Sequence, residues 1–190
     1  MRTNLFRPLG FTLIELLIVI AIITVLATLA IPSFNRLYLT SLSTAEMYKW
    51  QSVFNQGKQT AISNNKRVKI CPSSDQRQCH RNWHQGGVLF ADVNQDNVRS
   101  LSETLFKFIQ ASPRGFAINW NSFQNKDYLQ FEPTGFTHSQ NGTLLICSDN
   151  GRLFHRALIV SRSGRIRHSR DYNGDGIHET SQGVNIPCGN

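Results

Sequence analysis

The segment from residue 152 to residue 170, RLFHRALIVSRSGRIRHSR, contains six arginines and no acidic residue. An arginine guanidinium stays charged at any physiological pH, and its planar fork can donate two hydrogen bonds to one phosphate. This composition therefore favours binding of a polyanion such as DNA through its phosphates, without strong sequence preference. On charge alone, a solvated cationic hairpin is the alternative. The candidate arginines are Arg152, Arg156, Arg162, Arg165, Arg167 and Arg170.

Residues 161–164, SRSG, are typical of a hairpin turn in which Gly164 supplies the positive φ. In the return strand, the alternation of side chains turns Ile166 toward the core. Arg165 and Arg167 then share the opposite face about 6.7 Å apart, comparable to two base steps of about 3.4 Å along one DNA strand. This spacing suits neighbouring phosphates, and we expect the arginines before the turn to matter less.

Two polar loops resemble calcium-binding loops. The first places Asp92, Asn94, Asp96 and Glu103 at positions 1, 3, 5 and 12 of an EF-hand loop, but it has Asn97 where that loop needs glycine. No helices are predicted beside it. A hairpin turn explains the same residues.

The second loop, DYNGDG, keeps the glycine of a calcium loop but lacks the carboxylate at its last position. Its calcium candidates are Asp171, Asn173 and Asp175. An Asx-rich turn is the alternative. Apart from these candidates, we expect no metal site.

The chain has four cysteines, which allow two disulfides in three connectivities. Pairing in order would close a short polar loop and pin the carboxyl-terminal tail. Zinc is the alternative for the first two cysteines, because His80 and His84 follow them, although the spacing matches no standard zinc finger. The cysteines are Cys71, Cys79, Cys147 and Cys188.

No pattern typical of an enzyme is present. The sequence contains no GxSxG, HExxH or P-loop motif, and no paired carboxylates in a recognisable frame. We expect a protein without catalytic residues and without a cofactor.

An apolar stretch at residues 11–31 dominates the amino-terminal part of the chain. As a helix, its 21 residues reach about 30 Å, the thickness of a hydrocarbon core. Its single charge, Glu15, requires a cationic partner, because an ionised carboxylate at the membrane centre costs about 2.5 to 3.5 kcal/mol. We therefore predict a transmembrane helix with a functional carboxylate.

The junction GFTLIE, residues 10–15, resembles the processing site of type IV prepilins and type II secretion pseudopilins. The resemblance implies that a prepilin peptidase cleaves after Gly10 and methylates the new terminus at Phe11. The new ammonium would then lie about one helical turn from Glu15 and neutralise it, within one subunit or between neighbours. Residues 1–10 are thus expected to be a cleaved leader.

The remaining chain is long enough for one globular head. Apolar residues at helical spacing predict an amphipathic continuation of the helix over residues 32–63. From residue 64 to 190, seven short β-branched and aromatic runs between turn residues predict an antiparallel sheet or sandwich. The runs are VKIC, GGVLFADV, GFAINWN, YLQF, TLLIC, LFHRALIVS (residues 153–161) and RIRHS. The predicted fold is α+β: a long amino-terminal helix, transmembrane in its first half, packed on a pilin-like β-rich head.

The net charge of the whole chain is +8, which favours an acidic partner or surface. Arginines in the leader predict an inner-membrane protein with a single span and a periplasmic head. In that oxidising compartment, disulfides are favoured over zinc.

The leader, the CPSS…C loop, the GGVLFADVNQD segment and the terminal GRIR are together similar to the GspH/FimT family of minor pilins and pseudopilins. FimT-type members bind DNA through a GRxR motif during natural transformation, and the fixed positions of that motif match Gly164, Arg165 and Arg167. Expected partners are extracellular double-stranded DNA, other pilins and the prepilin peptidase. The alternative function is a tip or assembly-priming subunit of a type IV pilus or type II secretion system that does not bind DNA.

Overall fold

The computed structural model describes residues 11–137, 139–180 and 183–189. It contains two compact units, one up to Tyr38 and one from Leu39 onward. A single helix, α1 (Leu13–Asn64), contributes to both units, and Pro32 lies within it. The expected leader, with its cleavage residue Gly10, lies outside the described residues.

Thr12 starts α1 by accepting a hydrogen bond on its Oγ1 atom from the backbone N–H of Glu15, at 3.2 Å. By length and composition alone, α1 is the one helix in the described chain able to cross a membrane, and its most apolar stretch is unburied. Large apolar side chains in this stretch are more than half exposed at many positions, as at Ile23 and Leu26. The first unit therefore presents apolar surface all round.

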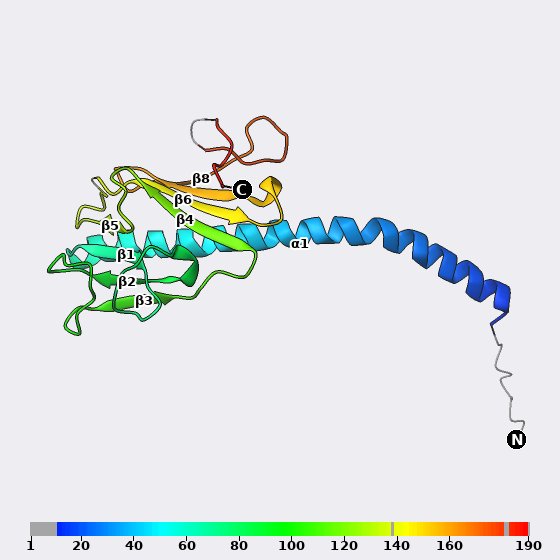
Figure 1. Cartoon of the computed structure of the whole chain (residues 1–190), viewed down its shortest axis with the longest axis horizontal. Coiled ribbons are helices and arrows are strands. Elements are labelled where there is room, and N and C mark those ends of the chain that lie inside the picture. The colour runs from blue at the N-terminus through cyan, green and yellow to red at the C-terminus, as the bar shows by residue number, and fades with distance from the viewer. Residues whose placement is uncertain (1–10, 138, 181–182, 190) are drawn as a thin grey trace, which may run out of the picture. The chain divides into compact units, whose positions relative to one another are not determined.

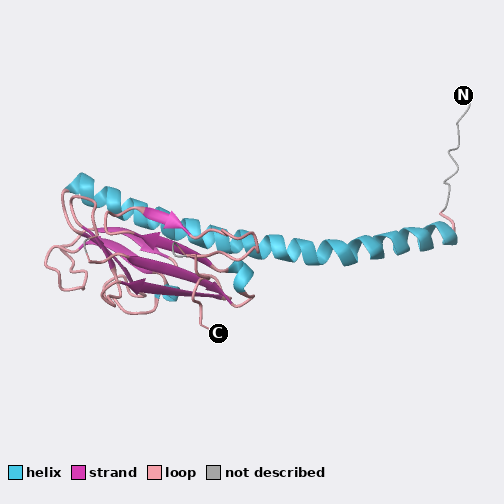
Figure 2. Cartoon of the chain, turned by 90° about the horizontal axis from the view of Figure 1, so that it is seen from above, coloured by secondary structure: helices cyan, strands magenta, loops and turns pink. Residues whose placement is uncertain are grey.

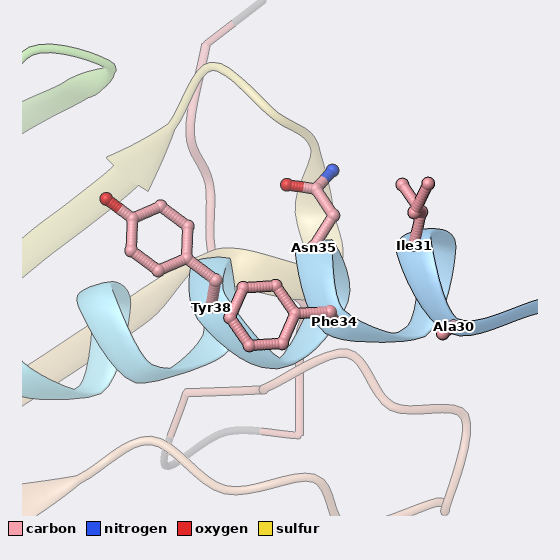
Figure 3. Close-up of a pocket in the computed structure, with 5 residues that line it drawn as sticks. All are labelled: Ala30, Ile31, Phe34, Asn35 and Tyr38. Carbon is pink, nitrogen blue, oxygen red and sulfur yellow. The ribbon is translucent and has the colours of Figure 1, made fainter. Parts of the chain in front are cut away.

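An apolar hollow of about 520 Å³ lies along the last part of this unit, where Figure 3 shows the residues that line it. The rings of Phe34 and Tyr38, one helical turn apart, form part of its wall and are 70% and 53% exposed. The remaining lining residues are Ala30, Ile31 and Asn35.

The second unit contains two antiparallel sheets of four strands each (Figure 1). The first sheet has the strand order β3-β2-β1-β5, and the second has the order β4-β6-β7-β8. The strands of the first sheet are β1 (Val68–Pro72), β2 (Gly87–Ala91), β3 (Leu105–Ile109) and β5 (Leu129–Phe131). Those of the second are β4 (Phe116–Ser122), β6 (Gly142–Ser148), β7 (Arg156–Val160) and β8 (Ile166–His168).

The carboxyl-terminal half of α1 packs against both sheets and completes one core (Figures 1 and 2). Trp50 and Phe54, one turn apart on the helix, are fully buried. Their rings meet Trp83, in the short 3-10 helix η1 (Trp83–Gln85), and Trp120 of β4, with centroid separations of 5.3 to 6.5 Å. Such edge-to-face aromatic packing stabilises the contact between helix and sheet beyond simple area burial.

The prediction of strands was right in seven segments and missed β3. This strand, LFKFI, follows a long polar loop, and its apolar residues do not alternate regularly with polar ones. It lies at the edge of the sheet, where Phe108 is 40% exposed. The segment at 153–161 is shorter as a strand than expected, because residues 152–154 form the 3-10 helix η2 (Arg152–Phe154).

Both disulfides of the expected pairing are present. Cys71 bonds Cys79 across a Cα separation of 5.5 Å, and Cys147 bonds Cys188 across 5.6 Å. The first closes the polar loop after β1, and the second ties the tail to β6. Because Cys71 and Cys79 are bonded to each other, the alternative zinc site with His80 and His84 is wrong.

Candidate nucleic-acid interface

The hairpin of β7 and β8 presents two arginines on the surface of the second sheet. β8 is the edge strand, and its register places Arg167 opposite Ile159 and Ile166 opposite Val160. Ile166 packs against the hydrophobic core, as predicted, while Arg165 and Arg167 are exposed. The alternation of the strand thus separates an apolar anchor from two cationic side chains.

The turn that connects these strands closes tightly around Gly164. The N–H of Ser161 donates to the Arg165 carbonyl at 2.9 Å, and the N–H of Gly164 donates to the Ser161 carbonyl at 2.8 Å. Gly164 has φ +69°, which confirms the predicted positive φ. A Cβ atom at this position would lie 2.1 Å from the carbonyl oxygen of Gly135, so the position accepts only glycine without rearrangement.

Two contacts from distant parts of the chain hold the turn. Lys58 of α1 donates from Nζ to the Gly164 carbonyl oxygen at 3.1 Å. The N–H of Thr137, a buried residue between β5 and β6, donates to the Arg162 carbonyl at 3.0 Å. Since both ends of the turn are bonded to the rest of the head, Arg165 emerges from a fixed backbone.

A groove of about 460 Å³ lies beside β8. Its lining includes three arginines and no carboxylate, so it is a cationic site. One residue, Gln51, comes from α1. The lining residues are Gln51, Arg165, Ile166, Arg167, His168, Arg170 and Tyr172.

Apart from the three arginines, His168 is the only residue of this lining whose side chain can carry a positive charge. Its ring meets the ring of Tyr48 edge-on at 5.3 Å. Burial lowers the pKa of the His168 imidazole, and the positive charge of Arg170 lowers it further. The imidazole is therefore neutral at pH 7, and the charge of the groove comes from its arginines.

Arg156 does not belong to this surface, which corrects the expectation from the sequence. The side chain is 5% exposed and donates from one guanidinium nitrogen to the carbonyl oxygens of Leu153 at 3.0 Å and His155 at 2.7 Å. Burial lowers the pKa of Arg156. The guanidinium of Arg156 therefore binds backbone carbonyl oxygens beneath the surface and is not accessible to a phosphate.

The other two arginines are exposed but lie elsewhere. Arg152 belongs to η2, at the end of β7 remote from the turn. Arg162 lies in the turn and lines a separate hollow of about 430 Å³ with Phe123 and Asn141. The structure therefore brings Arg165, Arg167 and Arg170 together, and leaves Arg152 and Arg162 apart from them.

The second acidic loop uses its oxygen atoms to shape its own backbone. Asp171 accepts hydrogen bonds from the N–H groups of Gly174 at 2.7 Å and Gly176 at 2.8 Å, and these bonds lower its pKa. Asp175 and Asn173 accept from backbone N–H groups in the same way. The expected alternative of an Asx-rich turn accounts for every one of these contacts.

The first acidic loop already encloses a cation of the protein. The ammonium of Lys69, a fully buried residue of β1, bonds to the carboxylate of Asp92 and, at 2.6 Å, to the Oδ1 atom of Asn97. Glu103 accepts from the N–H groups of Val93 and Ser100 at 2.8 and 2.9 Å. Over residues 11–137, 139–180 and 183–189, no group of three or more His, Cys, Asp or Glu side chains is arranged to hold a metal ion.

Three residues of the interface were missed in the sequence: Lys58, Gln51 and Tyr172. Lys69, which fills the first acidic loop, was missed as well. Tyr172 had a usable signal, because it is an aromatic residue two positions after Arg170 in a polar loop. No local signal marked the two lysines or Gln51. Lys58 and Lys69 bind residues that are far away in the chain, and Gln51 reaches the groove from α1.

Known proteins that resemble this chain include two pilins and a pseudopilin. The type IV major fimbrial protein FimA of Dichelobacter nodosus is 27% identical over 149 residues, which cover 66% of this chain and 92% of FimA. The crystal structure of the type IV minor pilin FimU of Pseudomonas aeruginosa matches with a TM-score of 0.51 and 18% identity, over 72% of this chain and 91% of FimU. The structure of the minor pseudopilin EpsH of the Vibrio cholerae type 2 secretion system has a TM-score of 0.46 and 11% identity, over 65% of this chain and 94% of EpsH.

The likeness to FimU establishes a pilin-like α+β fold, in which a long amino-terminal helix packs on antiparallel sheets. The prokaryotic N-terminal methylation motif matches residues 7–31. The family model of the type II transport protein GspH matches residues 49–164, more than half of the chain. The chain therefore belongs to the GspH family of minor pilins and pseudopilins, which are structural subunits and not enzymes.

Proposed function

We propose that this subunit is a minor pilin of the FimT type, which binds extracellular double-stranded DNA during uptake for natural transformation. The observation that carries the proposal is the pair Arg165 and Arg167, both exposed on an edge strand whose turn is fixed from two sides. Their guanidinium groups would bond to phosphates of one DNA strand, with no reading of base sequence.

Arg170 extends this pair within the same groove, and no carboxylate lines it. A cationic groove attracts DNA at long range, and its arginines would release the cations condensed on the phosphates that they contact, so binding would weaken as salt rises. The whole chain has a net charge of +8, and loss of Arg2 and Arg7 with the leader would leave +6, which adds to this attraction.

The proposed route to the cell surface follows from the prepilin features. Residues 1–10 would be removed by the prepilin peptidase, and the amino group of Phe11 would be methylated. Residues 11–31 would hold the subunit in the inner membrane, residues 32–63 would continue the helix, and residues 64–190 would form the periplasmic part. Glu15 would pair with the new amino terminus when the subunit enters a filament.

The second candidate function is a tip or assembly-priming subunit of a type IV pilus or type II secretion system. The match to the GspH model, which describes a type II transport protein, favours it. In that case Arg165 and Arg167 would meet acidic side chains of a neighbouring subunit.

Salt-dependent binding distinguishes the two functions. The full chain in nonionic detergent is titrated with fluorescent duplexes of unrelated sequence at several salt concentrations. Changing Arg165 and Arg167 together to Gln should reduce the slope of log K against log salt by about 1.8, at about 0.9 per lost phosphate contact. The matched control is Arg114→Gln with Arg152→Gln, two exposed arginines outside the groove. Equal affinity and slope in the wild type and the Arg165/Arg167 variant would leave only the tip-subunit function.

A further inference from the structure

The groove beside β8 contains one exposed aromatic residue, which lies among its arginines. The side chain of Tyr172 is 64% exposed and lines the groove together with Arg165, Arg167 and Arg170. No ring contact joins Tyr172 to any residue in the described part of the chain. An exposed ring next to several cations can stack on a flat ligand that is also anionic, and this combination is typical of sites for unpaired nucleic acid.

The backbone of Tyr172 is held in place by a buried carboxylate. Its N–H donates to the Oε2 atom of Glu179 at 2.7 Å, and Glu179 is 4% exposed. The backbones of Arg170 and Glu179 also bond to each other in both directions, at 3.3 and 2.7 Å. The aromatic ring therefore leaves the backbone at a fixed point, immediately after the last arginine of the groove.

The loop that follows is also closed from within. The two hydrogen bonds from Gly174 and Gly176 to Asp171 fold it back directly after Tyr172. Because its backbone is ordered before any ligand arrives, Tyr172 would lose little conformational entropy on binding.

These observations restrict the ligand. Neutral sugars stack on exposed tyrosines but do not need three arginines, and an acidic peptide would satisfy the arginines without needing a flat ring. Single-stranded nucleic acid needs both, because its phosphates seek cations and its unpaired bases expose their faces. In a duplex those faces are stacked inside, where Tyr172 cannot reach them.

We infer that the groove beside β8 binds single-stranded DNA, with phosphates on Arg165, Arg167 and Arg170 and one base stacked on Tyr172. The inference rests on the proposed function and extends it, since the same arginines would hold either DNA form. Gln51, on the α1 side of the groove, adds an amide that can donate to or accept from a base edge. The groove would thus prefer the unpaired strand that a frayed or partly unwound duplex offers.

Binding of the full chain in nonionic detergent to a fluorescent oligothymidine and to a duplex of equal length tests this preference. Tyr172→Ala should weaken oligothymidine binding roughly 5- to 100-fold, the effect of losing one stacked base, and should weaken duplex binding much less, with both salt slopes kept. Tyr172→Phe, which keeps the ring, should bind like the wild type. The matched control is Phe108→Ala, which removes an exposed ring from the other sheet.

A second readout follows the base itself. An oligonucleotide that carries 2-aminopurine should lose fluorescence on binding to the wild type, through stacking on the ring, and should keep it with Tyr172→Ala. The inference is overturned if Tyr172→Ala weakens both DNA forms equally, weakens neither, or leaves the quenching intact. It is also overturned if polyglutamate competes as well as oligothymidine at equal ionic strength.

The two proposals fail in different ways. If the change of Arg165 and Arg167 to Gln leaves duplex binding intact, the proposed function fails. If that variant loses duplex binding while Tyr172→Ala has no effect on the single strand, only the inference about the base fails.

Discussion

The Nζ atom of Lys58 lies 3.1 Å from the carbonyl oxygen of Gly164, so a residue near the end of α1 holds the turn of the hairpin formed by β7 and β8. The bond is part-buried and spans 106 positions of sequence. Because Gly164 directly precedes Arg165, the orientation of the helix and that of the cationic hairpin are coupled.

Removing this bond should weaken DNA binding more than the loss of one charge does. We expect Lys58→Gln to reduce duplex affinity and to lower the midpoint of denaturant unfolding by the equivalent of about 1.5 to 3 kcal/mol, as for a hydrogen bond to a charged group. The control is Lys66→Gln, which removes an equal charge from an exposed position. Equal effects of the two variants on affinity would show that Lys58 acts only through its charge.

Gly164→Val should impair DNA binding without changing the charge of the protein. The substitution places a β-branched residue at φ +69°, which costs at least about 1 kcal/mol, and drives its Cβ atom against the Gly135 carbonyl. Gly183→Val is the matched control, because Gly183 has φ +68° and open space around it. Anisotropy titrations and thermal unfolding of both variants separate the clash from the cost of the positive φ.

The buried pair of Lys69 and Asp92 should be essential to the stability of the head. Lys69 lies over the ring of Tyr128, with Nζ 4.3 Å from the centroid, and both charged groups are about 1% exposed. Lys69→Met leaves the carboxylate buried without a cation, which should cost about 3 to 5 kcal/mol. Adding Asp92→Asn to that variant should recover part of the loss in denaturant unfolding. Additive losses in the double variant would contradict the pairing.

Processing and assembly should depend on separate residues at the amino terminus. We predict that Gly10→Val blocks removal of the leader. Glu15→Val should still be cleaved but should assemble poorly, because it removes the carboxylate that the new amino group would neutralise. Immunoblots of membrane fractions and sheared pili measure both steps. Normal assembly of Glu15→Val would rule out the pairing.

The stability of the head should fall in mildly acidic solution. Burial lowers the pKa of His155, His168 and His178 from 6.5, so below pH 6.5 the unfolded chain binds more protons than the native one. Their contribution to stability is complete above pH 6.5 and is lost as the pH falls from there toward the native pKa values. Denaturant midpoints measured from about pH 7 to about pH 5 should decrease, and His155→Gln should flatten the change if the packing of the site is kept.

Local patterns in the sequence determined much of this protein. The long helix, the positive φ of Gly164 and the inward position of Ile166 all follow from residues that are close together in the chain. Helical spacing, strand alternation and the steric freedom of glycine act over a few residues, so they can be read without the fold. The amino-terminal motif is also a local signal, and it agrees with the methylation-motif match.

Only the tertiary structure decided which charged side chains are exposed and able to bind a ligand. Arg156 and Arg167 look alike in the sequence, yet the first is buried at the start of the inner strand β7 and the second is exposed on the edge strand β8. Lys69 takes the cation position of an acidic loop through contacts with residues 23 and 28 positions away, and Gln51 of α1 lines a groove whose arginines lie near the carboxyl terminus. The exposure of a charge depends on what packs over it, and packing between distant segments leaves no periodic pattern in the chain.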